Sequence, residues 1–529
     1  MSSKDFSEKA SLIETMGSEH TGRGRDWYGH LGGLLPILTV YLILAFYRID
    51  SQSLWTDEVI SLQRAAPTKL IQKGWPLYFA LLSLWKQAGT SELALRSLSV
   101  LLGAVAVCLV YVLSFTLFNR RVTLIGTALF ATSPFLIWYS QEVRYVILML
   151  VTAVLTMYAI QRVISRDSLG WWLTYGSTVI LALSSFISTL LLPVAQGLYL
   201  LWSPSRRPLL RKWLVCQMLV FALFVWWAGG IFQKPFVETT VSGQQTFSFD
   251  PKRLSSGTPK ELTAAMVPYT FFAFSTGFSL GPSLRDLHVS RSFATLVPHM
   301  PTLLISSILY GGLFFLGLIA IWRQPDVGMF LTLWVGVPII GALGVSALTN
   351  MAYNVRYVAM ALPAYTLILA AGIAGFRRPV VQITLLAAVL FVHGLSLANY
   401  YLDARYARED VRAAARYLAS VAHPKDVILV VGNTTALRYY YKGNVPIVSW
   451  SGSTNSDQSA VTKRLRELSK EHNRLWLVAV RPWETDPKGN VKTALINMYD
   501  LVEHKELPGV DIYSYQLSEP LSRPSAQRS

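Results

Sequence analysis

Charged residues are scarce in this sequence. Asp, Glu, Lys and Arg make up 15% of the 529 residues, whereas soluble globular proteins usually carry about a quarter. Only two cysteines are present, and because Cys108 and Cys216 lie within or beside apolar runs, a disulfide framework or a thiolate metal site is disfavoured. The sequence also lacks a Gly-rich nucleotide loop, a CxxC pair and an HExxH motif. A soluble nucleotide-sugar or ATP site therefore has no support.

Long apolar runs are what the sequence has in abundance, since hydrophobic residues make up 52% of it. A membrane helix needs about 20 mostly apolar residues. This rule predicts a polytopic α-helical membrane protein with about eleven transmembrane helices. The expected spans are 31–48, 95–118, 122–138, 145–163, 171–187, 189–203, 213–231, 302–322, 327–348, 357–375 and 379–398.

Basic residues indicate the orientation of these spans. The net charge of +17 needs no nucleic acid to explain it, because Lys and Arg gather in short loops between apolar runs. Placing five such loops in the cytoplasm lets the eleven spans alternate without conflict. Residues 1–30 are then a cytoplasmic tail, and the loops 49–94 and 232–301 lie outside. The five loops are marked by Arg120–Arg121, Arg162–Asp167, Arg206–Lys212, Arg323 and Arg377–Arg378.

Two outer loops contain short apolar pieces, and the composition changes after residue 400. The pieces "WPLYFALLSLWKQAG" and "MVPYTFFAFSTGFSLG" suit helices lying at the membrane surface better than spans. Beyond the 31–400 membrane module, "REDVRAAARYLASV" has helical periodicity and "DVILVVG" reads as a strand. Residues 401–529 are therefore expected to form a soluble α/β domain on the outer side.

The first outer loop opens with two adjacent acids, in "SLWTDEVISL" at residues 53–62. Neighbouring side chains point about 100° apart in a helix and opposite ways in a strand, so Asp57 and Glu58 do not form one clamp. They can perform two tasks, with one acid facing a reaction centre and the other bracing it. The alternative is a solvated pair at a helix N-terminus, where acids are favoured.

A second polar cluster, "WYSQEVRY", lies at the outer end of the third span. Glu142, Arg144 and Tyr145 would place a carboxylate and a guanidinium beside Asp57, and arginine suits bidentate recognition of phosphate. The alternative is an interfacial aromatic belt with a local ion pair.

The third cluster is "YNVRYVAMALP" at residues 353–363. Arg356 precedes Tyr357 at the outer end of the tenth span, where the positive-inside rule disfavours arginine. Its presence there suggests a substrate contact, with snorkelling to the interface as the alternative. Two other features have bland explanations: Glu92 and Arg96 have the i, i+4 spacing of a structural pair, and His393 reads as a satisfied buried histidine.

These clusters indicate a site at the outer membrane surface for a membrane-soluble anionic substrate. Two other classes of protein stay open. A lipid or solute transporter would carry its polar groups at mid-membrane or on broken helices. A non-catalytic assembly protein of an envelope polysaccharide system would use the acids only to brace the loop.

The order of these motifs resembles that of a known family. "SLWTDE", "GWPLYFALLSLW", "SELALRSLSVLLG", "SQEVRY" and "RYVAMALP" follow one another as in GT-C superfamily glycosyltransferases of the family 39-like type, which includes protein O-mannosyltransferases and aminoarabinose transferases. The likeness covers roughly residues 31–400, and the segment from Arg408 resembles the soluble outer domain of many bacterial members.

The resemblance implies an enzyme of the bacterial inner membrane. It would move a sugar from a polyprenyl-phosphate donor to a hydroxyl of a glycan, lipid or protein acceptor on the outer face. Asp57 matches the general base of such enzymes, and Glu58 matches the second acid of that motif. Residues expected to contact the substrate are Tyr78, Glu142, Arg144, Tyr145, Arg356 and Tyr357.

The sequence departs from the family pattern at two places. Many relatives read His-Pro-Pro-Leu-Tyr where this chain has Gly74-Trp75-Pro76-Leu77-Tyr78. Many also carry a histidine near the outer end of a middle span, where this chain reads Ser185-Phe186-Ile187-Ser188. The acceptor and the use of a divalent cation are therefore left open by the resemblance.

Overall fold

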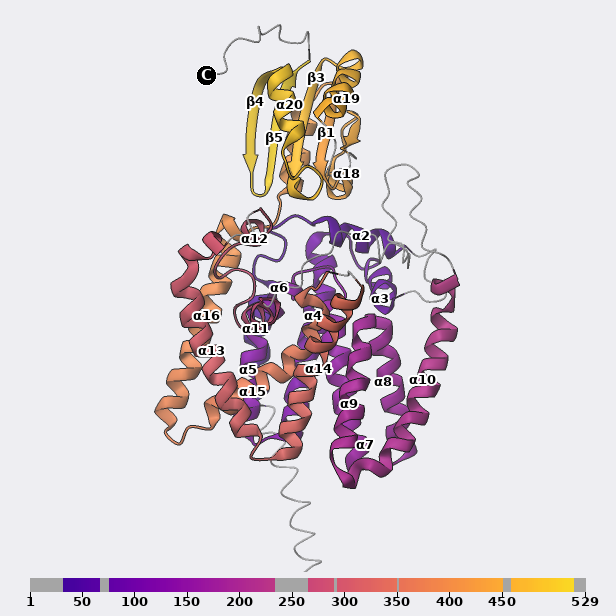
Figure 1. Cartoon of the computed structure of the whole chain (residues 1–529), viewed down its shortest axis with the longest axis vertical. Helices are drawn as coiled ribbons and strands as arrows, with labels where there is room; N and C mark the ends of the chain where they lie inside the picture. The colour runs from indigo at the N-terminus through magenta and orange to yellow at the C-terminus, as the bar shows by residue number, and fades with distance from the viewer. Residues whose placement is uncertain are drawn as a thin grey trace, which may run out of the picture.

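The computed structural model describes residues 32–66, 76–233, 265–289, 293–349, 352–450 and 458–517. The predicted N-terminal tail, most of the 232–301 loop and the Gly74-Trp75 pair lie outside these ranges. The described part consists of a helical bundle with a small α/β domain at one end (Figure 1).

Each of the eleven apolar stretches is helical. The helices are Gly32–Phe46, α4 (Glu92–Leu117), α5 (Arg120–Ala131) with α6 (Pro134–Ser140), α7 (Val146–Ser165), α8 (Leu169–Ser185), α9 (Leu191–Trp202), α10 (Arg207–Gln233), α13 (Met300–Ile321), α14 (Pro325–Thr349), α15 (Leu362–Ala374) and α16 (Pro379–Leu402). Within the described ranges, seven helices are long and apolar enough to cross a membrane, or eight if α5 and α6 count as one bent span. Gly32–Phe46 and Ile187–Trp202 are shorter apolar helices.

Local sequence explains where several helices begin and bend. The side chains of Ser91 and Asn119 accept hydrogen bonds from the backbone of the first turns of α4 and α5, which satisfies amides that have no partner within the helix. Pro134 lacks an amide hydrogen and suits the first position of α6. The bend of 50° between α5 and α6 therefore falls at the two residues before this proline.

Two glycines allow the close packing of α13 and α15. A Cβ atom at Gly317 would lie 2.0 Å from the carbonyl oxygen of Ile368, and one at Gly372 would lie 2.3 Å from that of Leu313. Small residues at facing positions let helix backbones approach closely inside a membrane. The α15 helix is consequently buried almost throughout its length.

Four short helices lie in the segments predicted to be outer loops. They are α2 (Thr56–Arg64), α3 (Leu77–Trp85), α11 (Met266–Thr276) and α12 (Leu284–Val289). In Figure 1, α2 and α12 lie at the end of the bundle that faces the α/β domain. The α11 helix is buried along one side, where the Phe274 ring meets Phe135 and the Ser275 hydroxyl pairs with Tyr365.

The predicted α/β domain is confirmed. Its five-stranded sheet has the order β2-β1-β3-β5-β4, with β1 parallel to β2 and β3, and with β5 antiparallel to β3 and β4. The β1 strand is completely buried, as its unbroken apolar run predicts. The elements are α17 (Val411–Val421), β1 (Asp426–Gly432), α18 (Thr435–Tyr440), β2 (Ile447–Ser449), α19 (Gln458–Glu471), β3 (Arg474–Val480), α20 (Asn490–Met498), β4 (Asp500–Leu507) and β5 (Val510–Gln516).

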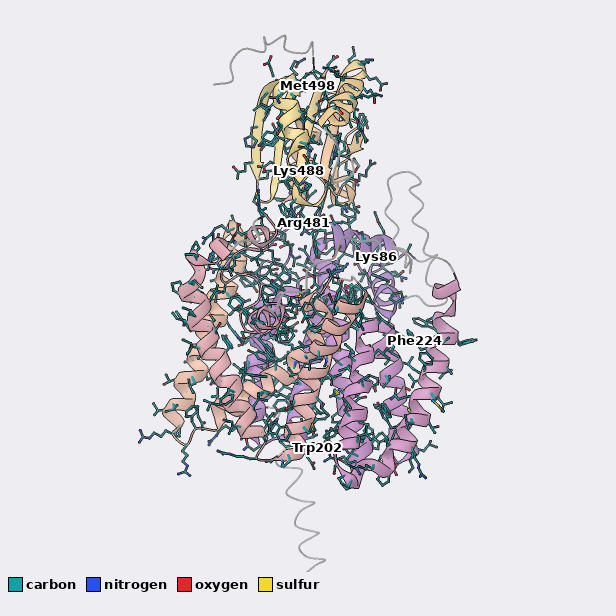
Figure 2. The ribbon with its side chains drawn as sticks, in the orientation of Figure 1. Lys86, Trp202, Phe224, Arg481, Lys488 and Met498 are labelled. Atoms are coloured by element: carbon teal, nitrogen blue, oxygen red, sulfur yellow. The ribbon has the colours of Figure 1, made fainter. Side chains whose placement is uncertain are left out.

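The α/β domain contacts the loop before α2. The Ser53 hydroxyl donates a hydrogen bond to the carbonyl oxygen of Glu409, at 2.7 Å, and the backbone amide of Leu54 donates one to the Tyr440 hydroxyl, also at 2.7 Å. The guanidinium of Arg481, which follows β3, lies over the Trp55 ring at 5.1 Å. Figure 2 shows Arg481 where the α/β domain meets the helical bundle. The α2 helix and its acids therefore lie at this junction.

Candidate active site at the junction of the bundle and the α/β domain

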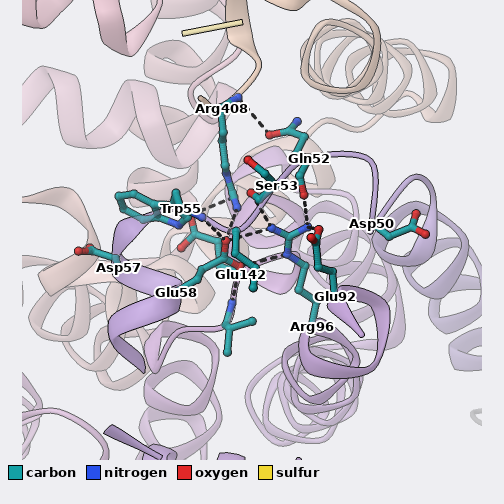
Figure 3. A network of polar contacts seen from close by, with 12 residues as sticks. Asp50, Gln52, Ser53, Trp55, Asp57, Glu58, Glu92, Arg96, Glu142 and Arg408 are labelled. Carbon is teal, nitrogen blue, oxygen red and sulfur yellow. Dashed lines mark hydrogen bonds and ion pairs between the residues drawn. The ribbon is translucent and has the colours of Figure 1, made fainter. Parts of the chain in front are cut away.

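The first turn of α2 sends its two acids in different directions. Trp55 precedes the helix, so Asp57 and Glu58 occupy its opening turn. Figure 3 shows the Asp57 carboxylate pointing away from the group of charged residues that Glu58 enters. The side chain of Asp57 is 25% exposed, whereas that of Glu58 is fully buried. The expectation that the two acids perform different tasks agrees with this geometry.

Asp57 is held between two arginines from distant parts of the chain. Its Oδ2 atom lies 3.1 Å from Arg144 Nη2 and 3.0 Å from Arg356 Nη1. Arg144, in the turn between α6 and α7, also donates from Nη1 to the carbonyl oxygen of Asp57 at 3.1 Å. Arg356 lies in the 3-10 helix Val355–Ala361 that leads into α15. We call Asp57, Arg144 and Arg356 the outer cluster.

The two guanidiniums determine the ionisation of Asp57. Burial alone would raise the pKa of this carboxyl, but the positive charges of Arg144 and Arg356 outweigh burial and hold the pKa below its usual range. Asp57 is therefore ionised at neutral pH. One carboxylate against two guanidiniums leaves the outer cluster with a formal charge of one positive unit.

The outer cluster has unused hydrogen-bond donors. The Nε atoms of Arg144 and Arg356 are buried and have no hydrogen-bond partner among the described residues. A buried donor without a partner costs free energy. Together with the excess positive charge, these donors make the cluster suited to an anionic ligand with several oxygen acceptors, such as a phosphate.

Three stacked aromatic rings adjoin the arginines. The Tyr145 and Phe186 rings stack at 4.3 Å between centroids, and Phe186 stacks on Tyr357 at 5.5 Å. The Arg144 guanidinium lies over the Tyr145 ring and the Arg356 guanidinium over the Tyr357 ring. The three rings come from separate elements of the chain. Because a guanidinium is attracted to the face of an aromatic ring, the outer two rings help to hold Arg144 and Arg356, which in turn hold Asp57.

Glu58 enters a second group of charges, which we call the inner cluster: Glu58, Arg96, Glu142 and Arg408 (Figure 3). Arg96 from α4 binds Glu58 with two hydrogen bonds, Nε to Oε1 at 3.1 Å and Nη2 to Oε2 at 3.0 Å. The amides of Val143 and Trp55 also donate to the Glu58 carboxylate. Burial would raise the pKa of Glu58, but the charges of Arg96 and Arg408 and these donors hold it below its usual value.

Glu142 makes its ion pair in the inner cluster, while the charges of Arg144 and Arg356 also act on it. Its Oε1 atom accepts hydrogen bonds from Trp138 Nε1 at 2.9 Å and from Arg408 Nη2 at 3.0 Å. Burial raises the pKa of Glu142 in spite of Arg408, and the nearby Glu58 adds to the increase. The turn after α6 explains the separation, because it directs Glu142 inward and Arg144 outward.

The fold of the chain, and the sequence of residues 73–228, match known proteins. A family model described as dolichyl-phosphate-mannose-protein mannosyltransferase matches residues 73–228. The structure superposes on ArnT from Cupriavidus metallidurans bound to undecaprenyl phosphate with a TM-score of 0.55 at 11% identity, covering 91% of this chain and 98% of that one. The apo state of ArnT gives a TM-score of 0.56 at 10% identity, covering 92% and 98%. This is the GT-C fold.

Another GT-C structure supports the same assignment. The Archaeoglobus fulgidus oligosaccharyltransferase in complex with Zn and sulfate superposes with a TM-score of 0.51 at 14% identity, covering 92% of this chain and 74% of that one. No curated protein sequence matches the chain. The resemblance read from the sequence motifs is therefore confirmed at the level of the GT-C fold.

Tyr78 and Glu92 each have defined partners in the structure. The Tyr78 ring is completely buried, and its hydroxyl lies 3.5 Å from that of Ser99 on α4. Glu92 lies 3.9 Å from Arg96, as the i, i+4 spacing suggests. Its shorter contacts are with Arg412 at 3.0 Å and with the Tyr440 hydroxyl at 2.7 Å, so Glu92 binds mainly to the α/β domain.

Three residues of the site were missed in the sequence. Phe186 stands in the segment where many relatives carry a histidine, and the sequence indicates no role for it. Arg408 and Arg481 lie in segments that read as ordinary parts of a soluble domain. The position of Arg408 could have indicated its role, because it follows the end of α16 at Leu402 closely enough to reach the outer end of the bundle.

The described residues contain no ligand set for a divalent cation. Within these ranges, no three His, Cys, Asp or Glu side chains come together as a metal site would require. Asp57 and Glu58 bind different arginines, because Glu58 pairs with Arg96 while Asp57 pairs with Arg144 and Arg356. His393, the other residue considered, is buried, and its Nδ1 atom pairs with the Thr132 hydroxyl at 3.0 Å. Arg144 and Arg356 are the described groups of the outer cluster that suit an anion.

Proposed function

We propose that this protein is an inverting glycosyltransferase. It moves a sugar from a polyprenyl-phosphate donor to an acceptor hydroxyl on the outer face of the bacterial inner membrane. The observation that carries the proposal is Asp57, held between Arg144 and Arg356 where the helical bundle meets the α/β domain. The fold likeness to ArnT, which was solved bound to undecaprenyl phosphate, supports the choice of donor.

Asp57 is the proposed general base. The acceptor oxygen attacks the anomeric carbon, the bond from that carbon to the phosphate oxygen breaks, and the acceptor proton passes to Asp57. A positioned base of this kind contributes about 10²–10⁴-fold to the rate. Polyprenyl phosphate leaves with one more negative charge, and Arg144 and Arg356 stabilise that charge as it develops.

The donor phosphate and Asp57 compete for the same two guanidiniums. Before the donor binds, Asp57 occupies Arg144 and Arg356. When the phosphate takes these donors, Asp57 loses the charges that hold its pKa down, and burial then raises that pKa. Because a base is most effective when its pKa lies nearer the working pH, donor binding strengthens Asp57 as a base.

The test is a transfer assay with purified protein in detergent or vesicles. A panel of polyprenyl-phosphate sugars is incubated with an acceptor extract, and both the donor and the released polyprenyl phosphate are measured. We expect release that depends on the acceptor for at least one donor of the panel. Intact donor throughout the panel, with a broad acceptor extract present, would instead favour a transporter or a non-catalytic assembly protein.

Replacing Arg356 is expected to weaken both binding and turnover. Arg356→Gln removes a charged donor to the phosphate, and such a hydrogen bond is worth about 1.5–3 kcal/mol, which corresponds to about 10–150-fold in kcat/KM. The measurement is kcat and KM for the donor. Arg285→Gln is the matched control, because Arg285 is an exposed arginine of α12 that binds Asp511 of the α/β domain.

The same variant is expected to change the pH profile. Removing Arg356 takes away one of the charges that lower the pKa of Asp57, so this pKa rises. Activity that needs ionised Asp57 is lost as the pH falls through that pKa, and the acid limb of kcat/KM therefore moves to higher pH. An acid limb that stays in place in Arg356→Gln would contradict the role of Asp57 as the base.

A further inference from the structure

One arginine links the membrane part to the α/β domain from inside the protein. Arg408 lies between the end of α16 at Leu402 and the start of α17 at Val411. Its side chain is only 6% exposed, because it runs into the helical bundle instead of toward solvent. Figure 3 shows it entering the inner cluster from the side of this connecting segment.

Arg408 joins two acids from different elements. Its Nη2 atom lies 3.0 Å from Glu142 Oε1, and its Nη1 atom lies 3.5 Å from Glu58 Oε2. The guanidinium also lies over the Trp138 ring at 4.9 Å, and the backbone amide donates to the Gln52 side chain at 3.2 Å. The two acids and the Trp138 ring hold the guanidinium, and the contact with Gln52 holds the backbone of Arg408.

The two acids that Arg408 joins adjoin the residues of the outer cluster. Glu58 is next to Asp57 on α2, and Glu142 lies two residues before Arg144. The Glu58–Arg408–Glu142 bridge therefore connects the same two segments that meet in the Asp57–Arg144 ion pair. A change in the inner bridge would shift Asp57 relative to Arg144.

Charge balance gives Arg408 a second task. Glu58 and Glu142 are balanced by Arg96 and Arg408, so the inner cluster is formally neutral. Without Arg408, Glu58 would keep Arg96, but Glu142 would lose the arginine with which it forms its ion pair. An uncompensated buried charge is strongly unfavourable. Neighbouring residues of the same segment also hold the loop before α2, since Arg412 donates to the carbonyl oxygens of Asp50 and Ser51.

We infer that Arg408 is a positioning residue for the transfer reaction, in which the Glu58–Arg408–Glu142 bridge fixes α2 and so places Asp57 beside Arg144 and Arg356. The inference rests on the proposed function for its kinetic part only. Arg408 touches no group of the outer cluster, so it acts on the rate through the placement of α2. The segment that leads into the α/β domain is then part of the catalytic apparatus.

The kinetic test compares Arg408→Gln and Arg408→Lys with Arg405→Gln. Arg405 is a matched control three residues upstream, because its side chain is 74% exposed and pairs with Asp403. A displacement of a catalytic group by 1 Å can cost about 10²-fold, so we expect a loss of this size in kcat for Arg408→Gln. The donor KM should stay unchanged, in contrast to Arg356→Gln, and Arg408→Lys should recover part of the rate.

A double variant keeps the test valid if Arg408→Gln folds poorly. Arg408→Gln with Glu142→Gln removes one charge of each sign and leaves the inner cluster neutral. We expect the loss on replacing Arg408 to be smaller when Glu142 is already Gln. If the loss in kcat of the double variant equals the product of the losses in the two single variants, the proposed coupling of Arg408 and Glu142 is overturned.

Backbone hydrogen exchange of residues 49–64 gives a readout that needs no activity. We expect faster exchange in Arg408→Gln than in the unmodified protein, and no change in Arg405→Gln. Where the unmodified protein transfers sugar, normal exchange of residues 49–64 together with normal kcat in Arg408→Gln overturns the inference. A change in the exchange rate alone, or in kcat alone, also overturns it. If the unmodified protein transfers no sugar, the proposed function fails, while faster exchange alone would still show that Arg408 holds the loop.

Discussion

We expect the Asp57→Asn variant to insert and fold normally, yet to transfer sugar about 10²–10⁴-fold more slowly. Asparagine has nearly the same shape but does not take the proton from the acceptor hydroxyl. The substitution also leaves Arg144 and Arg356 without a competing carboxylate, so polyprenyl phosphate should bind at least as tightly as before. Turnover and lipid-phosphate binding are measured on the same purified preparation.

The matched control is Asp50→Asn. Asp50 is an exposed acid of the same outer loop, and its carboxylate points away from the inner cluster in Figure 3. Its replacement should leave transfer unchanged. Near-normal turnover by Asp57→Asn would remove Asp57 as the base, and weaker lipid-phosphate binding would mean that Asp57 serves the donor instead.

Arg96→Met is expected to have the largest effect on stability. Arg96 binds Glu58 with two hydrogen bonds and donates to the carbonyl oxygens of Ile49, Gln52 and Ser53. Removing one partner of a buried ion pair costs about 3–5 kcal/mol, because the other charge is left without compensation. The measurement is thermal unfolding in detergent, followed by tryptophan fluorescence, together with the yield of folded protein.

Two further variants separate the causes of this loss. Arg121→Met replaces an exposed arginine at the start of α5, so it should unfold like the unmodified protein. Arg96→Met combined with Glu58→Gln removes both charges and should recover part of the lost stability. An Arg96→Met protein as stable as Arg121→Met would show that the inner cluster is not needed for folding.

The length of the apolar runs predicted the helical architecture well. Each predicted span falls on a helix, because an apolar run that cannot expose its backbone to lipid must form intrahelical hydrogen bonds. The lengths of the individual helices were less predictable. Pro134 divides one stretch into α5 and α6, and the helices beginning at Gly32 and Ile187 are shorter than a full span.

The outer cluster could be anticipated because its members lie in short polar segments at the ends of apolar runs. Arg144 was expected beside Asp57, and the structure joins both Arg144 and Arg356 to it. Their roles in catalysis and donor binding stay predictions. Tyr145 and Tyr357 adjoin these arginines as expected, although the ring between them, Phe186, was not foreseen.

The inner cluster was not predictable from sequence spacing. Local spacing assigned Arg96 to Glu92, whereas the fold brings Glu58 closer to it through a contact between residues that are 38 positions apart. Glu142 and Arg144 are close in sequence, but a turn directs their side chains to different clusters. Arg408 lies more than 260 residues from Glu142, so only the completed fold brings them together.

The position of Arg408 in the sequence determines when the inner cluster becomes complete during synthesis. Synthesis proceeds from the N-terminus, so the ribosome adds Arg408 after the other three members of the inner cluster. Until then, Glu58 and Glu142 have Arg96 as the one arginine of the cluster, and the group carries an excess negative charge. The inner cluster therefore gains its full set of charges only after α16, which ends at Leu402, has been synthesised.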